Sequence, residues 1–244
     1  MGKLEGRSAI VTGAGSGLGR GIALRLASEG AQVIAADITD AAKETAALGG
    51  GKIHAFKGDI SDAKAVETLI SEAVKRFGRL DILCNNAGIA SQLAPLHEVE
   101  VEDFDRVIAV NLRGVFLGMK FGLAQMVKQG GGVILNTASV GSMYASPLIA
   151  PYNASKGGVV MLTKQAAIDY ADKNIRVNAV CPATVNTPMV QAAPKEVVDS
   201  LIARIPMGRL ASIEDVASMA LFLVSDEASF LTGGAYLVDG GSTA

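Results

Sequence analysis

One tyrosine in this sequence stands where a side chain could transfer protons. Tyr152 is followed four positions later by Lys156, and this spacing places both side chains on one face of a helix. Tyr144, Tyr170 and Tyr236 have no lysine at the matching position. An unperturbed tyrosine has a pKa of about 10, and a neighbouring ammonium group favours the phenolate. We therefore expect Lys156 to lower the pKa of Tyr152 for general acid–base catalysis.

A serine hydroxyl precedes this pair in the sequence. Ser139 follows the expected strand Gly132–Asn136, so its side chain lies near the end of a strand. A hydroxyl there can donate a hydrogen bond to a substrate oxygen whose charge changes during reaction. A surface tyrosine–lysine pair on an amphipathic helix is the alternative, and the pair alone does not exclude it.

A glycine-rich turn links the first expected strand to the first expected helix. It reads Thr-Gly-x-x-x-Gly-x-Gly from Thr12 to Gly19. Glycines let a ligand approach the backbone, and the start of the helix offers free N–H groups to a pyrophosphate. A glycine-rich turn without a ligand is the alternative. The residues that we expect to contact a dinucleotide here are Gly13, Ser16, Gly17, Leu18 and Gly19.

Asp37 favours the dinucleotide interpretation. It ends the second expected strand, where a carboxylate can accept hydrogen bonds from the adenosine ribose hydroxyls. A 2′-phosphate would be repelled there, and Ser16 and Ile38 stand where a cation would compensate. We therefore predict NAD rather than NADP as the cofactor. Asp59 and Ile60 are expected at the adenine, although Asp59 could instead cap the next helix.

Short apolar segments alternate with helical patterns, which is typical of a parallel sheet covered on both faces. The sequence predicts a single-domain α/β protein, residues 1–244, with a Rossmann-type doubly wound sheet of about seven parallel strands and helices on both faces. The expected strands are Ser8–Val11, Gln32–Asp37, Lys52–Phe56, Asp81–Cys84, Gly132–Asn136, Arg176–Val180 and Ala235–Val238. The expected helices are Leu18–Glu29, Asp40–Leu48, Asp62–Arg76, Asp103–Lys128, Asn153–Asp172 and Ile213–Leu223. Ser61 and Ser212 are expected to cap helices, and residues 182–207, which lack periodicity, are expected to form a substrate lid.

Composition narrows the class of protein further. The formal net charge is −2 with no basic block, which argues against nucleic acid as a partner. There is no signal-like segment at Met1 and no run of 18 apolar residues, so we expect no membrane span. Cys84 and Cys181 lie in apolar segments and are expected to be buried free thiols. A cytoplasmic protein without a metal site is the expectation.

The whole chain resembles the short-chain dehydrogenase/reductase family. The motifs that carry the resemblance are, in order, Thr12-Gly13-x-x-x-Gly17-x-Gly19, Asn85-Asn86-Ala87-Gly88, Asn111, Ser139, Tyr152-x-x-x-Lys156 and Asp239-Gly240-Gly241. The resemblance implies that Tyr152 is the acid/base and that Ser139 orients the substrate oxygen. It implies that Lys156 binds the nicotinamide ribose, and that Asn111 holds a water linking Lys156 to solvent.

The resemblance also implies further cofactor contacts. Asn86, Ala87 and Gly88 would border the adenosine and support the central strand, while Pro182, Val185 and Thr187 would meet the nicotinamide. Ala183 replaces a glycine that is usual after Pro182 in this family, which could narrow the face presented to the nicotinamide.

The segments expected to line the substrate pocket are 89–96, 141–151 and 183–194, and none contains a charged residue. A carboxylate or phosphate substrate would ordinarily require Arg or Lys there. Apolar side chains available are Leu93, Met143, Tyr144, Leu148 and Met189. We therefore expect interconversion of an uncharged, fairly apolar secondary alcohol and its ketone, with a 3-oxoacyl-(acyl carrier protein) reductase and a non-catalytic nucleotide-binding protein as alternatives.

The resemblance further implies a homo-oligomer, a tetramer built on two long helices. Apolar residues on more than one face of those helices fit this arrangement, although burial against the chain's own sheet explains part of the pattern equally well. The residues in question are Val115, Phe116, Met119, Val160 and Leu162.

Overall fold

A computed structural model describes residues 2–191 and 194–244. Seven strands form one sheet in the order β3-β2-β1-β4-β5-β6-β7, and every neighbouring pair is parallel. The strands are β1 (Ser8–Thr12), β2 (Gln32–Asp37), β3 (Ile53–Lys57), β4 (Ile82–Asn85), β5 (Gly132–Thr137), β6 (Ile175–Pro182) and β7 (Ala235–Val238). Parallel neighbours need crossover connections, and helices supply them here.

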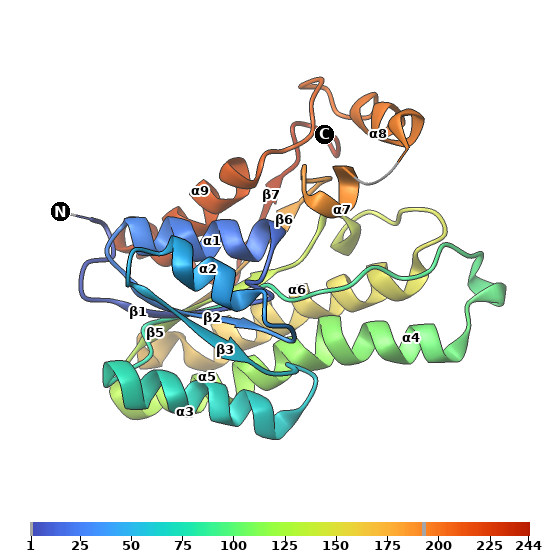
Figure 1. Ribbon diagram of the computed structural model, residues 1–244. Coiled ribbons are helices and arrows are strands. Elements are labelled where there is room, and N and C mark those ends of the chain that lie inside the picture. Colours follow the sequence, from blue (N-terminus) through green and yellow to red (C-terminus); the bar gives the residue numbers. More distant parts are fainter. Residues whose placement is uncertain (1, 192–193) are drawn as a thin grey trace.

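Helices cover both faces of the sheet (Figure 1). On one face lie α1 (Gly17–Ser28), α2 (Ala42–Leu48) and α9 (Ile213–Val224). On the other lie α3 (Ala63–Phe77), α5 (Gly114–Gln129) and α6 (Ala150–Tyr170), with α4 (Val101–Ile108) preceding α5. The predicted single-domain, doubly wound sheet is therefore confirmed.

The core follows from the alternation of side chains along each strand. In β1, Ala9 and Val11 belong to the apolar cluster shared with α1 and α9, whereas Ile10 belongs to the cluster shared with α3, α5 and α6. Successive side chains in a strand point to opposite faces, so a sheet covered twice requires apolar residues at consecutive positions. Cys84 and Cys181 are both buried and free, as expected.

Two local features differ from the sequence prediction. The helix expected over Asp103–Lys128 begins at Val101 and is interrupted by a π-helical turn at Ala109–Arg113. The cap of α3 is Asp62, not Ser61, because the Asp62 side chain accepts the Lys64 amide. At α9, by contrast, Ser212 forms the expected cap and makes a capping box with Asp215.

The expected lid, 182–207, contains regular structure that the sequence pattern did not predict. Short helices α7 (Pro188–Gln191) and α8 (Lys195–Ile202) lie in it, above the carboxyl ends of the strands (Figure 1). Each helix starts at or just after a proline, which presets the backbone for a first turn. Residues 192 and 193 of the expected lid lie outside the described residues.

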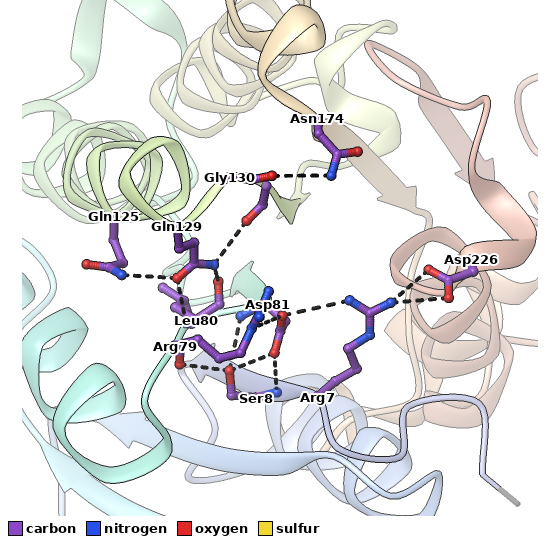
Figure 2. Close-up of polar contacts among 11 residues, drawn as sticks. Arg7, Ser8, Arg79, Leu80, Asp81, Gln125, Gln129, Gly130, Asn174 and Asp226 are labelled. Carbon is purple, nitrogen blue, oxygen red and sulfur yellow. Dashed lines mark hydrogen bonds and ion pairs between the residues drawn. The ribbon is translucent and has the colours of Figure 1, made fainter.

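The opposite, amino-terminal edge of the sheet is tied together by polar contacts (Figure 2). Asp81 is buried and accepts hydrogen bonds from the Ser8 amide and hydroxyl, while Arg79 Nε donates to it at 2.6 Å. Arg7 lies between Asp81 and Asp226 and is bonded to both oxygens of Asp226. This network stabilises the connection of β1 with β4.

The continuous helical stretch Val101–Gln129 meets the length and hydropathy criteria for crossing a membrane. Half of its most apolar window is buried inside the protein, against the sheet and its neighbouring helices. The core helix of a soluble protein meets the same criteria, so this stretch is weak evidence for a membrane span.

Candidate active site

A cavity of about 610 Å³ opens at the carboxyl edge of the sheet. It lies where the strand order reverses between β1 and β4, the place where doubly wound sheets bind ligands. All of the predicted cofactor-binding residues line it: Gly13, Ser16, Gly17, Leu18, Gly19, Asp37, Asp59, Ile60, Asn86, Ala87, Gly88, Tyr152, Lys156, Pro182, Val185 and Thr187. Ser139 lines it as well, whereas Asn111 does not. The fold therefore brings widely separated motifs to one cavity.

The turn after β1 has the geometry of a phosphate cradle. Gly13 and Gly17 have φ angles of 63° and 52°, which side chains rarely adopt. A Cβ on Gly13 would lie 2.7 Å from Ala87 Cα, so the turn packs tightly against the segment after β4. Ser16 caps α1 without a side-chain hydrogen bond, which leaves N–H groups of the first helical turn open to the cavity. These residues fit a pyrophosphate.

Asp37 lies beside this turn and is held in place by three donors. Its Oδ2 accepts the Gly15 amide at 2.9 Å, and its Oδ1 accepts the Thr39 amide and hydroxyl. The nearest arginine on α1, Arg20, donates to the Gly15 carbonyl but is paired with Glu44 at 2.8 Å. Its charge is therefore already matched by a carboxylate.

Asn86 joins three strand ends. Its amide and side-chain nitrogen donate to Thr12 at the end of β1, and its Oδ1 accepts the Thr137 hydroxyl at the end of β5. The predicted support of the central strand is thus visible as hydrogen bonds. Asp59 accepts the Ser61 amide and hydroxyl in a turn of its own, rather than capping α3.

The Ser139 and Tyr152 hydroxyls lie together on the cavity wall. Ser139 Oγ accepts the Gly141 amide at 3.1 Å, which occupies one of its lone pairs. The Ser139 side chain lies close enough to the Tyr152 hydroxyl to lower the pKa of Tyr152. The two hydroxyls therefore converge on one point, where a substrate oxygen can meet both.

Lys156 is buried, with 3% of its surface exposed. Its Nζ donates to the Thr137 carbonyl at 2.8 Å and lies 5.7 Å from the centre of the Tyr152 ring. Burial lowers its pKa from 10.5 to about 8, because desolvation disfavours the ammonium. The contact with Thr137 had no signal in the sequence, because its acceptor is a backbone carbonyl.

The expected effect of Lys156 on Tyr152 is wrong for the protein without cofactor. Burial raises the pKa of Tyr152, and only the hydrogen bond with Ser139 opposes this. The ammonium lies over the ring and is bonded to Thr137, so it does not contact the phenol oxygen. Tyr152 therefore holds its proton at neutral pH and is poised as an acid.

Asn111 lies behind the cavity in the π-helical turn and is fully buried. Its side chain accepts the Ile89 amide at 2.8 Å and donates to the Ile89 carbonyl and to Ser155 Oγ. A Cβ on Gly88 would lie 3.4 Å from both Asn111 Oδ1 and Lys156 Nζ. The side chain thus anchors the loop after β4 close to Lys156, and the water relay stays a prediction.

The apolar residues expected at the substrate end are placed differently. Leu93, Met143, Tyr144 and Leu148 are all exposed, and none lines the cavity. The side chain of Met189 lies outside the described residues. The apolar wall consists instead of other residues of the same segments: Ile89, Ala90, Ile149, Ala183, Pro188 and Val190. Length and shape of these loops, rather than composition, decide which side chains face inward.

Comparison with known proteins identifies the family. The family described as enoyl-(acyl carrier protein) reductase matches residues 13–243. The chain belongs to the short-chain dehydrogenase/reductase family. It is accordingly an oxidoreductase that acts on CH–OH groups with a nicotinamide cofactor.

Individual relatives cover nearly the full chain. A 2-(R)-hydroxypropyl-CoM dehydrogenase of Xanthobacter autotrophicus is 42% identical, with 98% of this chain and 99% of the relative aligned. A cyclohexanol dehydrogenase of Acinetobacter is 40% identical, over 99% and 96%. The crystal structure of a 3-ketoacyl-(acyl-carrier-protein) reductase from Brucella melitensis, complexed with NADH, is 41% identical. It aligns with a TM-score of 0.94 over 99% and 100% of the two chains.

Proposed function

We propose that this protein is an NAD-dependent dehydrogenase that interconverts an uncharged, fairly apolar secondary alcohol and its ketone. The observation that carries the proposal is the shared cavity: the Ser139–Tyr152 hydroxyl pair and buried Lys156 line the same space as the glycine turn and Asp37. A proton donor and a dinucleotide cradle on one wall are the requirements of hydride-transfer chemistry.

The residues divide the chemistry as follows. A bound nicotinamide would supply the centre that gives or accepts a hydride. Tyr152 Oη gives its proton to the oxygen of a ketone, or takes the proton from an alcohol in the reverse direction. Ser139, whose Oγ accepts the Gly141 amide through a lone pair, turns its O–H from Tyr152 to donate a hydrogen bond to the same oxygen. Lys156, fixed by Thr137, would hold the nicotinamide ribose.

We propose NAD as the preferred cofactor because Asp37 places a carboxylate beside the turn and the nearest arginine is paired with Glu44. Asp37→Ser should raise the ratio of kcat/KM for NADP to that for NAD by about tenfold or more, since it removes charge repulsion and ribose hydrogen bonds. Asp37→Asn is the matched control: it removes the charge but keeps an acceptor, and should fall between. A wild-type preference for NADP contradicts the proposal.

An apolar alcohol is proposed because the described cavity wall at the substrate end carries no charged side chain apart from Lys156. The similarity to a cyclohexanol dehydrogenase favours a cyclic alcohol within this class. Absorbance of the reduced nicotinamide, followed with NAD and a panel of cyclic, linear and acidic alcohols, tests it directly. Turnover that is fastest with a sugar acid would overturn the substrate class, and no turnover at all would favour a binding protein.

The similarity to a 3-ketoacyl-(acyl-carrier-protein) reductase supports a second candidate function, reduction of a 3-oxoacyl thioester. Acetoacetyl-coenzyme A belongs in the same panel for this reason. If it is reduced far faster than any cyclic ketone, the second candidate replaces the first.

We further propose that residues 182–207 act as a lid. Thr187 lies opposite the glycine turn, because a Cβ on Gly17 would lie 3.6 Å from its methyl carbon.

We also propose that the protein is a tetramer. Three of the residues expected at the interface are buried in the chain's own core and therefore cannot lie at that interface: Val115, Met119 and Val160. Phe116, which was also expected there, is exposed on α5, and the further exposed apolar side chains on α4, α5 and α6 are Phe104, Val127, Met161 and Ile168.

Light scattering should give the mass of four chains, and Met161→Lys combined with Ile168→Lys should lower it, because two charges on α6 cannot be buried unpaired. Leu48→Lys introduces a charge on an exposed apolar residue of α2 and should leave the mass unchanged. A wild-type mass of one chain contradicts the tetramer.

A further inference from the structure

The loop after β4 is fixed residue by residue. Asn111 bonds both the amide and the carbonyl of Ile89, and Arg106 donates to the Ala90 carbonyl at 3.3 Å. Asp103 is buried and accepts the Gln92 amide at 2.9 Å, and it forms an ion pair with Arg106. The backbone on both sides of Ser91 is therefore held by side chains of α4 and the π-helical turn.

Ser91 lies at the centre of this loop, and its side-chain hydroxyl lacks the hydrogen bonds that hold its neighbours. It lines the cavity, and the residue is 9% exposed. Among the residues that the structure describes, its Oγ is buried without a hydrogen-bond partner. Buried hydroxyls in proteins are ordinarily bonded, so an unbonded one within a well-anchored loop calls for a partner beyond the described side chains.

The neighbourhood of Ser91 is the substrate end of the cavity rather than the adenosine end. Three residues further on, the Ala94 amide donates to the Leu148 carbonyl at 3.0 Å. This contact brings the loop beside the start of α6, where Ile149 and Tyr152 line the cavity. A partner of Ser91 would thus be bound at the same end of the cavity as the proton donor.

We infer that Ser91 is a specificity-determining residue: its hydroxyl hydrogen-bonds a second, uncharged oxygen of the substrate, distant from the oxygen that Tyr152 protonates. Rotation about the Cα–Cβ bond moves a serine hydroxyl from one staggered rotamer to another, so that it can reach a new partner. The anchored backbone of the loop keeps the Cα of Ser91 in place during this rotation. The inference rests on the proposed function and narrows its substrate to an alcohol or ketone, cyclic as proposed, that bears a further hydroxyl, carbonyl or ether oxygen.

Pairs of ketones that differ only in this oxygen test the inference. We would measure kcat/KM with NADH for 3- and 4-hydroxycyclohexanone and for their methyl counterparts, in the wild type and in Ser91→Ala. At the favoured ring position, the hydroxy-to-methyl ratio should fall about tenfold in Ser91→Ala, because one neutral hydrogen bond is lost. The methyl compounds should keep their wild-type values within about twofold, since their binding does not use the hydroxyl.

A structural role for Ser91 would change both members of each pair equally, and an unchanged ratio or an equal loss overturns the inference. Ser91→Thr, which restores a hydroxyl, should recover the ratio if the variant folds with an unchanged NADH affinity. If neither ketone is reduced, the proposed function fails. Calorimetric titration of the hydroxy and methyl compounds into the protein with NAD then still tests whether Ser91 binds the second oxygen. Tighter binding of the hydroxy compound by the wild type than by Ser91→Ala supports the inference, and equal binding overturns it.

Discussion

Tyr152→Phe should lower kcat for ketone reduction by about 10²–10⁴-fold, the usual contribution of a positioned proton donor. The change removes one oxygen atom and keeps the ring, so the packing around α6 is preserved. Because burial raises the pKa of Tyr152, the wild type holds this proton throughout the neutral range, and the loss should be the same from pH 6 to pH 8. Steady-state rates with NADH and a cyclic ketone measure it.

Two further measurements separate chemistry from binding in this variant. The affinity for NADH should stay within about threefold, because Tyr152 contributes only part of a large cavity. Tyr170→Phe is the matched control: it makes the same chemical change at the other end of α6 and should leave the rate unchanged. Retention of most of the wild-type turnover in Tyr152→Phe would remove Tyr152 from the reaction.

Lys156→Met should abolish most activity and yet make the protein more stable at neutral pH. Burial lowers the pKa of Lys156 from 10.5 to about 8, which corresponds to about 3 kcal/mol by which the folded state disfavours the ammonium. Methionine has no charge to bury, but it leaves the Thr137 carbonyl without its donor, at a cost of about 1 kcal/mol. The free energy of unfolding should therefore rise by about 2 kcal/mol.

The stability gain of Lys156→Met could come from removal of the buried ammonium or from better packing, and its dependence on pH distinguishes the two. Below about pH 8 both folded and unfolded states carry the ammonium, so the wild type bears the full penalty and the variant's advantage is largest. Between about pH 8 and pH 10.5 the unfolded state binds more protons than the folded state, so the wild type gains stability as pH rises. The advantage of Lys156→Met should shrink over that window.

Urea unfolding at pH 7 and pH 10, at equal protein concentration, measures the difference between the two proteins. Lys164→Met, at an exposed lysine of the same helix, should change neither stability nor activity appreciably. A stability gain of Lys156→Met that stays constant between the two pH values would show that the ammonium carries no burial penalty.

The sequence alone determined the architecture and the residues that we propose as the catalytic set. Apolar residues at consecutive positions of the strands specify a sheet that is buried on both faces. The spacing of the glycines specifies the turn after the first strand. Both patterns can be recognised from the sequence because they depend only on neighbours along the chain. Tyr152 and Lys156 were recognisable since helical periodicity is local as well. The bounds of β2 and β7 are those predicted, and the other strands differ by a few residues at their ends.

The tertiary structure alone decided what each of these groups experiences. The pKa of Tyr152 depends on burial and on Ser139, and that of Lys156 depends mainly on burial, and neither is encoded in spacing. The π-helical turn at Asn111 and the exposure of Leu93 and Met143 follow from how the loops close over the sheet. Contacts of this kind join residues far apart in the chain, so they arise only when the whole fold has brought backbone and side chain together.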